Sequence, residues 1–221
     1  NRTAIENAIK FLKDEGGVDF IFHFAAYYDF SYDDHPAYNT INVEGTKNLL
    51  ELSENICKKR FIFASSLAAC EFPRKGEKVT EKDEPNADYH YARSKKLGEK
   101  MVRQYSRKFP CSVLRLAAVY SDWCEFAPLY KFLSLWLDNK IDSRILGGKG
   151  ESAIPYIHVK DLCKLVTEIF KQTEELPDFD IYNASPDGCT SHRELYELAT
   201  RYYYGEAKKP LHIPKWIAYP G

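Results

Sequence analysis

The sequence has no excess of charge of either sign. Its 221 residues carry 31 Lys and Arg against 32 Asp and Glu, which gives a formal net charge of −1. Nucleic acids and anionic membrane surfaces attract proteins through a positive field, and a balanced chain does not generate one. We therefore expect no nucleic-acid partner.

Long apolar runs are also missing. The longest, such as FIFHFAAYY at residues 20–28, fall well short of the roughly 20 residues that a membrane-spanning helix needs. The chain does not open with the features of a secretory leader. We expect no membrane span in this segment.

The cysteines lack the short paired spacings of a zinc site or a disulfide framework, and the six histidines are equally scattered. Such a distribution is typical of reduced thiols. We expect a cytoplasmic protein without a metal. The six cysteines are Cys57, Cys70, Cys111, Cys124, Cys163 and Cys189.

Short apolar runs alternate with segments of helical periodicity. The chain, 44% hydrophobic, is long enough for one sizeable core and a small second lobe. Alternation of strand and helix predicts crossover connections, and therefore an α/β fold with a doubly wound parallel sheet. We expect strands at residues 18–25, 60–66 and 112–117, and helices at residues 1–17, 36–55 and 89–108.

Two of these segments carry more detailed expectations. The run at 18–25 is almost continuously apolar, which predicts a strand covered on both faces. In the helix at 36–55, one stripe of helical spacing is expected to face the core. Its residues are Ile41, Gly45, Leu49 and Leu52.

The alternation of strands and helices breaks after Tyr120. A loop and helix with two tryptophans follow, then short strands within 145–159, a helix at 160–172 and a strand at 179–184. A last helix is expected at 190–203, without a capping box because Thr190 stands three residues before an Arg. We predict a main domain of residues 1–120 plus 160–184, and a smaller lobe of residues 121–159 and 185–221.

Tyr91 and Lys95 stand four residues apart in the helix at 89–108, so they share one helical face. A phenol with an ordinary pKa near ~10 needs a downward shift of roughly three units to act as a base at neutral pH. One cation about 4 Å away supplies roughly that much at an effective dielectric near 20. The spacing alone fits proton chemistry, and it fits equally a half-buried tyrosine beside a solvated lysine.

Other polar residues allow both structural and chemical roles. Ser66, at a predicted strand end, could cap the following loop or contact a substrate, whereas Ser65 is expected to be structural. His23 and His158 read as satisfied histidines within strands. Arg115, in mid-strand, is expected to pair with a buried carboxylate or carbonyl, and the run Lys58-Lys59-Arg60 to be a solvated strand entrance.

Six stretches, taken together, resemble the extended short-chain dehydrogenases/reductases, the group that includes NAD-dependent epimerases and dehydratases. The resemblance runs from Ile5 to about Leu195. The stretches are HFAAYY at 23–28, NVEGTKNLLE at 42–51, FASSLAA at 63–69, YARSK at 91–95, LRLAAVY at 114–120 and YIHVKDL at 156–162.

The resemblance implies a catalytic group of Ser66, Tyr91 and Lys95. In the family the tyrosine exchanges a proton with a substrate oxygen, the serine hydrogen-bonds that oxygen, and the lysine holds the nicotinamide ribose and depresses the tyrosine pKa. The implied cofactor is NAD, with NADP left open, and the implied substrate is a small molecule, a nucleotide sugar. A homodimer is also consistent with the family.

The resemblance also implies which residues bind ligands. The cofactor-binding residues would be Phe24, Ala25, Ala26, Tyr27, Asn42, Tyr91, Lys95 and Leu116, with Asn42 in a supporting role. The substrate-binding residues would be Ser66, Leu67, Tyr91 and Ala118.

The sequence departs from the family at the phosphate cradle. The glycine-rich turn T-G-x-x-G-x-x-G is absent, and the one glycine cluster, at 147–150, lies in another part of the chain. We therefore expect an N-terminally truncated Rossmann-like domain with an open sheet edge and a small C-terminal substrate lobe. Two alternatives stay open: an oxidoreductase similar to 3-beta-hydroxysteroid dehydrogenase or dihydroflavonol reductase, suggested by the tryptophan-bearing segment 120–137, and a non-catalytic cofactor-sensing protein.

Overall fold

The structure, a computed structural model, describes residues 2–31, 33–74, 76–138, 140, 142–186 and 188–214. The chain divides into two compact units. The first consists of Asn1–Ala117 and Cys163–Ala184, and the second of Ala118–Leu162 and Ser185–Gly221. The boundaries expected from the sequence, at residues 120, 160 and 184, lie within three residues of these.

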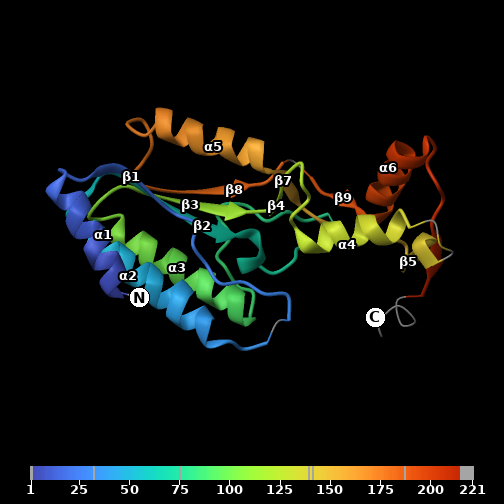
Figure 1. Cartoon of the computed structure of the whole chain (residues 1–221), viewed down its shortest axis with the longest axis horizontal. Helices are drawn as coiled ribbons and strands as arrows, with labels where there is room; N and C mark the ends of the chain where they lie inside the picture. Colours follow the sequence, from blue (N-terminus) through green and yellow to red (C-terminus); the bar gives the residue numbers. More distant parts are fainter. Residues whose placement is uncertain are drawn as a thin grey trace. The chain divides into compact units, whose positions relative to one another are not determined.

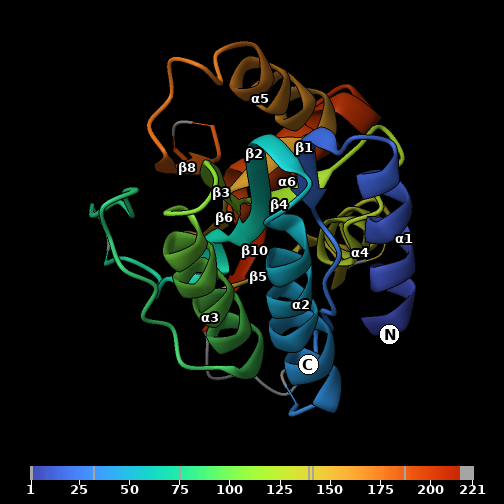
Figure 2. The same cartoon turned by 90° about the vertical axis from the view of Figure 1, so that its left-hand side faces the viewer.

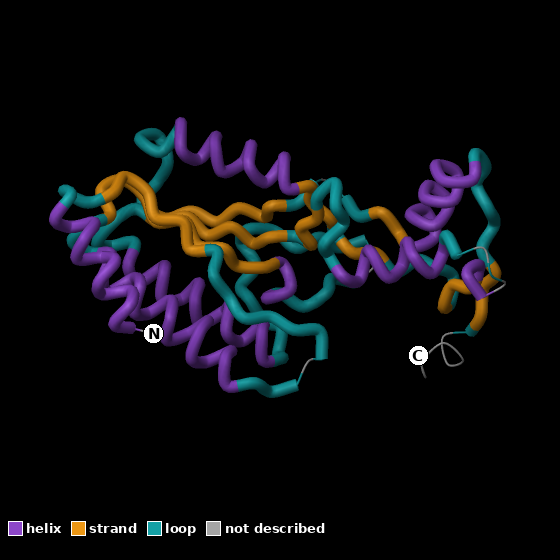
Figure 3. Tube along the Cα trace, in the orientation of Figure 1, coloured by secondary structure: helices purple, strands orange, loops and turns teal. Residues whose placement is uncertain are grey.

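The first unit contains a parallel sheet of four strands in the order β1-β2-β3-β8. They are β1 (Val18–His23), β2 (Cys57–Ser66), β3 (Cys111–Leu116) and β8 (Phe179–Ala184), and each neighbouring pair is parallel. The strands run side by side (Figure 3), and the predicted parallel sheet is confirmed.

Helices cover both faces of this sheet. Figure 1 shows α1 (Arg2–Asp14), α2 (Glu44–Ser53) and α3 (His90–Tyr105) below the strands and α5 (Val159–Lys171) above them. In Figure 2 the first three helices lie next to one another in a row. The doubly wound, Rossmann-like arrangement predicted from the alternation is therefore present.

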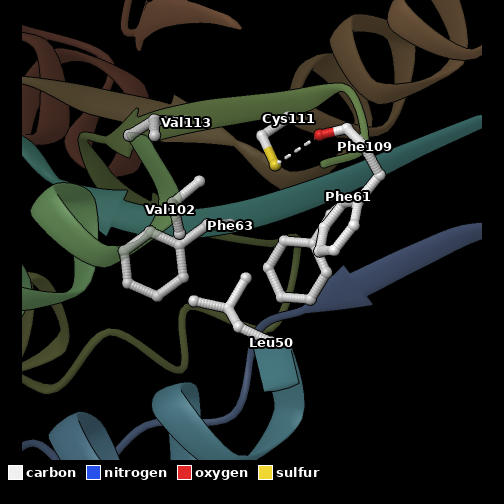
Figure 4. Close-up of a cluster of buried hydrophobic side chains, with 7 residues drawn as sticks. All are labelled: Leu50, Phe61, Phe63, Val102, Phe109, Cys111 and Val113. Carbon is white, nitrogen blue, oxygen red and sulfur yellow. Dashed lines mark hydrogen bonds between the residues drawn. The ribbon is translucent and has the colours of Figure 1, made fainter. Parts of the chain in front are cut away.

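The main core lies between the sheet and the helices α2 and α3. Alternate residues of β2 and β3 point to this face because side chains alternate along a strand. Burying each large apolar side chain contributes roughly 1.5–3 kcal/mol. Figure 4 shows the cluster, which consists of Leu50, Phe61, Phe63, Val102, Phe109, Cys111 and Val113.

The edge strand β1 is less covered than the sequence suggested. Within the described residues β1 pairs only with β2, and its free edge is open. Phe22 is 43% exposed, so the prediction that both faces of this strand are covered is wrong. Phe20 packs against Phe170 of α5 with ring centroids 4.5 Å apart. An apolar run alone does not reveal whether a strand lies at the centre or the edge of a sheet.

The segment after β1 differs from the expected single helix at 36–55. A π-helical segment, η1 (Tyr38–Val43), precedes α2. The face that points inward is also different, because Ile41 is exposed whereas Thr46 and Leu50 are buried. The extra residue of each π turn rotates the helix and shifts the buried stripe.

Within the described residues the second unit contains three small sheets, two longer α-helices and the short 3-10 helix Asp142–Arg144. Trp136, Leu146 and Tyr196 form its core. The strand pairs are β4 (Ala118–Tyr120) with β7 (Tyr156–His158), β5 (Ile145–Gly147) with β10 (Leu211–Ile213), and β6 (Ala153–Ile154) with β9 (Thr190–Ser191). The helices are α4 (Ala127–Trp136) and α6 (His192–Tyr204).

The start of α6 corrects another expectation. Ser191 accepts a hydrogen bond from the backbone N–H of Glu194, and the Glu194 carboxylate accepts one from the backbone N–H of Ser191. This is a full capping box, so the prediction of a helix from residue 190 without a capping box is wrong. Among the described residues, no helix has the length and apolar character to cross a membrane.

Candidate active site

The carboxyl ends of the parallel strands meet at one edge of the sheet. Ser66 ends β2 and Leu116 ends β3, and the two residues are paired across these strands. Ala25 and Ala26 follow β1 and are exposed. Ligands of open α/β sheets bind outside these strand ends. The predicted site residues are therefore expected to lie at this edge of the sheet.

Helix α3 approaches the end of β2 closely because it carries Gly98 against the ring of Phe63. A Cβ atom at Gly98 would lie 2.5 Å from Phe63 Cζ, well inside van der Waals contact. The buried face of α3 also includes Lys95 and Glu99, whereas Leu97 is 46% exposed. Close packing of this face brings the Lys95 side chain to the backbone of β2.

Lys95 is buried, with 4% of its surface exposed. Its ammonium Nζ donates to the carbonyl oxygen of Ala64 at 2.8 Å and lies 5.7 Å from the centre of the Tyr91 ring. Burial lowers the pKa of Lys95 to about 8, and the Glu99 carboxylate opposes this shift. The structure therefore places a cation of reduced basicity beside the phenol.

Tyr91 is half-buried and is linked to Ser66. Burial raises the pKa of the Tyr91 phenol above its ordinary value, and a hydrogen bond with Ser66 partly offsets this effect. The resemblance implied that Lys95 depresses this pKa, but in this geometry the pKa is raised because burial is the larger cause. At neutral pH the phenol of Tyr91 is therefore protonated.

Ser66 caps the segment that follows β2, which is one of the two roles that the sequence left open, and it also interacts with Tyr91. Its Oγ accepts a hydrogen bond from the backbone N–H of Ala68 at 3.2 Å and caps the short helix Leu67–Ala69. A hydroxyl oxygen can accept one bond while its proton is donated elsewhere. The cap therefore fixes the serine without removing its capacity to donate.

Aromatic side chains surround Tyr91. The ring of Tyr28 lies 4.6 Å from the Tyr91 ring and that of Tyr38 lies 6.4 Å away, measured between centroids. Neither tyrosine was among the predicted site residues. Tyr28 stands just after the first strand, next to Tyr27, and this position was a signal that could have identified it. Tyr38 begins η1 and carried no such signal.

Asn42 holds the loop after β1 in place. Its Oδ1 accepts from the backbone N–H of Tyr27 at 2.7 Å, and its Nδ2 donates to the Tyr27 carbonyl at 2.9 Å. The same Nδ2 donates to Ser94 Oγ of α3 at 3.0 Å. Asn42 thus joins this loop to the helix that carries Tyr91 and Lys95.

The predicted site residues do not all belong to one unit. Phe24, Ala25, Ala26, Leu67 and Leu116 lie in the first unit with the catalytic candidates. Ala118 opens β4 in the second unit.

A sequence model of the NAD dependent epimerase/dehydratase family matches residues 1–185, which is most of the chain. The chain belongs to this family.

Two curated proteins illustrate the relationship to other members. A putative UDP-glucose 4-epimerase of Methanocaldococcus jannaschii is 28% identical over 170 residues, covering 75% of this chain and 54% of that protein. The uncharacterized protein y4nG of Sinorhizobium fredii is 23% identical over 204 residues, covering 91% and 48%. The chain thus spans about half the length of the curated relatives it matches.

Solved structures of NAD-dependent family enzymes share this fold. UDP-glucose 4-epimerase of Thermus thermophilus in complex with NAD has a TM-score of 0.74 at 20% identity, covering 97% of this chain and 70% of that one. The dTDP-glucose 4,6-dehydratase of Bacillus anthracis in complex with NAD has a TM-score of 0.72 at 21% identity, covering 95% and 65%. At these identities the likeness shows the fold.

The residues of this family member fit one end of the cofactor. The buried ammonium of Lys95 is a donor suited to ribose hydroxyls, and exposed Ala25 and Ala26 leave the backbone after β1 accessible to a planar group. The glycine cluster at 147–150 lies in the second unit, where Gly150 packs against Leu146 and Arg193. The described residues therefore fit the nicotinamide ribose and not the pyrophosphate.

Three structural expectations are confirmed in this family member. His23 Nε2 lies 2.8 Å from Thr46 Oγ1, and His158 Nε2 lies 3.1 Å from Asp122 Oδ1, so both rings have partners. Arg115 forms an ion pair with buried Glu99 at 2.9 Å.

The prediction that the basic run Lys58-Lys59-Arg60 is solvated is wrong for Arg60. Arg60 is 1% exposed and donates to Thr173 Oγ1 at 3.0 Å and to the Pro177 carbonyl at 3.0 Å. Lys58 and Lys59 are exposed as expected. A run of like charges does not show which member turns inward, because the partners lie more than 100 residues away in the sequence.

Proposed function

We propose that this chain forms part of an NAD-dependent epimerase, dehydratase or dehydrogenase that acts on a nucleotide sugar. Its membership of the NAD dependent epimerase/dehydratase family supports the reaction class. The similarity to a putative UDP-glucose 4-epimerase supports a nucleotide sugar as the substrate. NAD is the proposed cofactor, since several proteins of the same fold are described as NAD complexes.

The observation that carries the proposal is the arrangement of Ser66, Tyr91 and Lys95. Ser66 stands at the end of β2 and lowers the pKa of the Tyr91 phenol, and the Lys95 ammonium lies 5.7 Å from the centre of the Tyr91 ring. When bound, the nicotinamide supplies the hydride acceptor and donor. Tyr91 would exchange a proton with the substrate oxygen, and Ser66 would orient that oxygen.

Tyr91 would enter the reaction in its protonated form in this geometry. Because the pKa of Tyr91 is raised, the phenol holds its proton at neutral pH. Removal of a proton from a substrate hydroxyl needs further positive charge beside the phenol. Lys95, already bound to the Ala64 carbonyl, does not by itself supply enough.

The remaining predicted residues have binding roles in this proposal. Phe24, Ala25, Ala26, Tyr27 and Leu116 would contact the cofactor, and Leu67 and Ala118 the substrate. Asn42 would act through the backbone of Tyr27, which it holds by two hydrogen bonds.

Tyr91→Phe in the full-length protein tests the mechanism. Loss of the phenol hydroxyl should reduce turnover by about 10²–10⁴-fold while NAD binding is retained. Tyr105→Phe is the matched control, because it makes the same change near the other end of α3. Full turnover by Tyr91→Phe would exclude the proposed role.

The steroid-like alternative rested on the two tryptophans of segment 120–137. Trp136 is buried in the core of the second unit against Tyr196, whereas Trp123 is 86% exposed. A non-catalytic cofactor sensor has a separate signature. It would bind NAD and turn over no nucleotide sugar even with Tyr91 intact.

A further inference from the structure

Glu99 is a buried carboxylate next to the candidate catalytic group. It follows Lys95 by one helical turn on α3 and has 6% of its surface exposed. Its Oε1 accepts from Ser65 Oγ at 2.5 Å. Arg115 Nη2 donates to Glu99 Oε2 at 2.9 Å and Arg115 Nε to Oε1 at 3.1 Å. These contacts join α3 to the last residues of both β2 and β3.

Among the described residues, Glu99 is the one buried carboxylate beside two buried cations. Lys95, Glu99 and Arg115 are all buried, which gives two cations to one carboxylate. The other titratable groups facing Lys95 are His23 of β1 and Tyr91 of α3. Burial lowers the pKa of His23 to about 4, and burial raises that of Tyr91, so both are neutral near pH 7. Arg115 also lies in the field of the Glu84 and Asp83 carboxylates. Glu99 is the carboxylate that acts on Lys95.

Arg115 extends these contacts to the loop that leads into α3. Its Nη1 donates to the carbonyl oxygen of Asp83 at 2.7 Å and to that of Thr80 at 3.4 Å. A buried guanidinium is stable when its donors are occupied by charged and polar acceptors. Glu99 thus anchors Arg115, which also holds the loop that precedes α3.

We propose that Glu99 is a positioning residue for Ser66, Tyr91 and Lys95: its carboxylate keeps the Lys95 ammonium charged and, through Ser65, holds the end of β2 against α3. The benefit of Glu99 to catalysis rests on the proposed function. The contacts of Glu99 do not, because they are made among four buried side chains, which are Ser65, Lys95, Glu99 and Arg115. The Cβ atoms of residues four apart on a helix lie about 5–6 Å apart, so Lys95 and Glu99 share one buried face of α3.

The test is a titration of Lys95 in the full-length protein labelled with ¹³C at lysine Cε. The resonance is assigned by its loss in Lys95→Arg. Glu99→Gln, which removes the charge and keeps the shape, should lower the midpoint of Lys95 by about one pH unit or more. Glu99→Asp, which keeps the charge, should give a Lys95 midpoint close to that of the parent protein. Glu44→Gln, at an exposed site on α2, should leave the midpoint unchanged.

An unchanged Lys95 midpoint in Glu99→Gln overturns the proposal, as does an equal drop in Glu44→Gln. If Glu99→Gln does not fold, the double variant Glu99→Gln with Arg115→Gln removes one buried cation together with the carboxylate. In that background Lys95 should titrate lower than in Arg115→Gln alone, because the two variants differ only in the Glu99 charge. Equal midpoints in these two variants overturn the proposal. The measurement needs no turnover, so it is independent of the result with Tyr91→Phe.

Discussion

The ammonium of Lys95 donates to the carbonyl oxygen of Ala64 at 2.8 Å, two residues before β2 ends at Ser66. This bond fixes a helical side chain to the backbone of the strand that carries the candidate serine. It also holds the ammonium in a buried position, where a charge is costly. A charged Lys95 therefore supports the proton chemistry proposed for Tyr91 but destabilises the fold.

Replacing Lys95 by Met should stabilise the fold near neutral pH. The folded-state pKa of about 8 lies below the ordinary value of 10.5, so the unfolded chain binds more protons between these values. Lys95 therefore weakens the fold below pH 8, and this penalty disappears as the pH rises toward 10.5. Removal of Lys95 should raise the free energy of unfolding at pH 7 by up to about 3 kcal/mol, while Glu99 stays paired with Arg115.

Urea unfolding at pH 7 and pH 10 measures this effect. The stability difference between the Lys95→Met variant and the parent should shrink at the higher pH. Lys96→Met, at the adjacent exposed position, serves as the control and should change little at either pH. A destabilised Lys95→Met variant at pH 7 would show that the Ala64 contact outweighs the cost of burial.

Gly98→Ala should separate α3 from β2. The added Cβ would lie 2.5 Å from Phe63 Cζ and 3.0 Å from Cε1. Overpacking of this kind costs about 1–3 kcal/mol. Gly45→Ala is the matched control, since the nearest atom to a Cβ there is the Thr40 carbonyl oxygen at 3.9 Å.

Thermal or chemical unfolding should therefore show opposite signs for the two glycine variants. Gly45→Ala gains helix propensity of up to about 1 kcal/mol, whereas Gly98→Ala loses stability. Equal stabilisation of both variants would mean that Phe63 moves aside at little cost.

Arg60→Met should destabilise the first unit severely. Arg60 is buried between β2 and the segment before β8, with donors to Thr173 Oγ1, Thr173 O and Ser112 Oγ. Its loss also removes the guanidinium that lies 3.5 Å from the half-buried carboxylate of Asp180, which keeps the Tyr182 hydroxyl as a donor. Breaking such a pair costs about 3–5 kcal/mol. Lys59→Met removes an exposed cation from the same run and should cost less than about 1 kcal/mol in denaturant titration.

The stability of the fold should fall between pH 6.5 and pH 4 through His23. Burial, assisted by the charge of Lys95, lowers the pKa of His23 from 6.5 to about 4. Between these values the unfolded chain binds the extra proton, so this contribution is full above pH 6.5 and is lost as the pH falls toward 4.

NMR titration of His23 should give a midpoint near 4, and His23→Gln should flatten the pH dependence of the unfolding free energy. His212→Gln, at an exposed position of β10, should leave that dependence in place. A His23 midpoint near 6.5 would instead indicate that water reaches the ring beside Thr46.

Some buried contacts could be predicted from the sequence and others could not. The Arg115 pairing could be predicted because an arginine within a strand needs an acceptor. The buried Arg60 could not, because its partners Thr173 and Asp180 come from a distant part of the chain. The start of α6 was missed because the capping pair is Ser191 and Glu194, one residue beyond the position that was considered.

Local spacing was enough to determine the alternation of strands and helices, the parallel sheet, and the shared helical face of Tyr91 and Lys95, because these depend on backbone periodicity. Only the tertiary structure decided that β1 is half exposed and that Glu99 and Arg115 accompany Lys95. It also decided that the Tyr91 pKa is raised. Burial and pKa depend on which surfaces the folded chain brings together, and neighbouring residues in the sequence do not specify that.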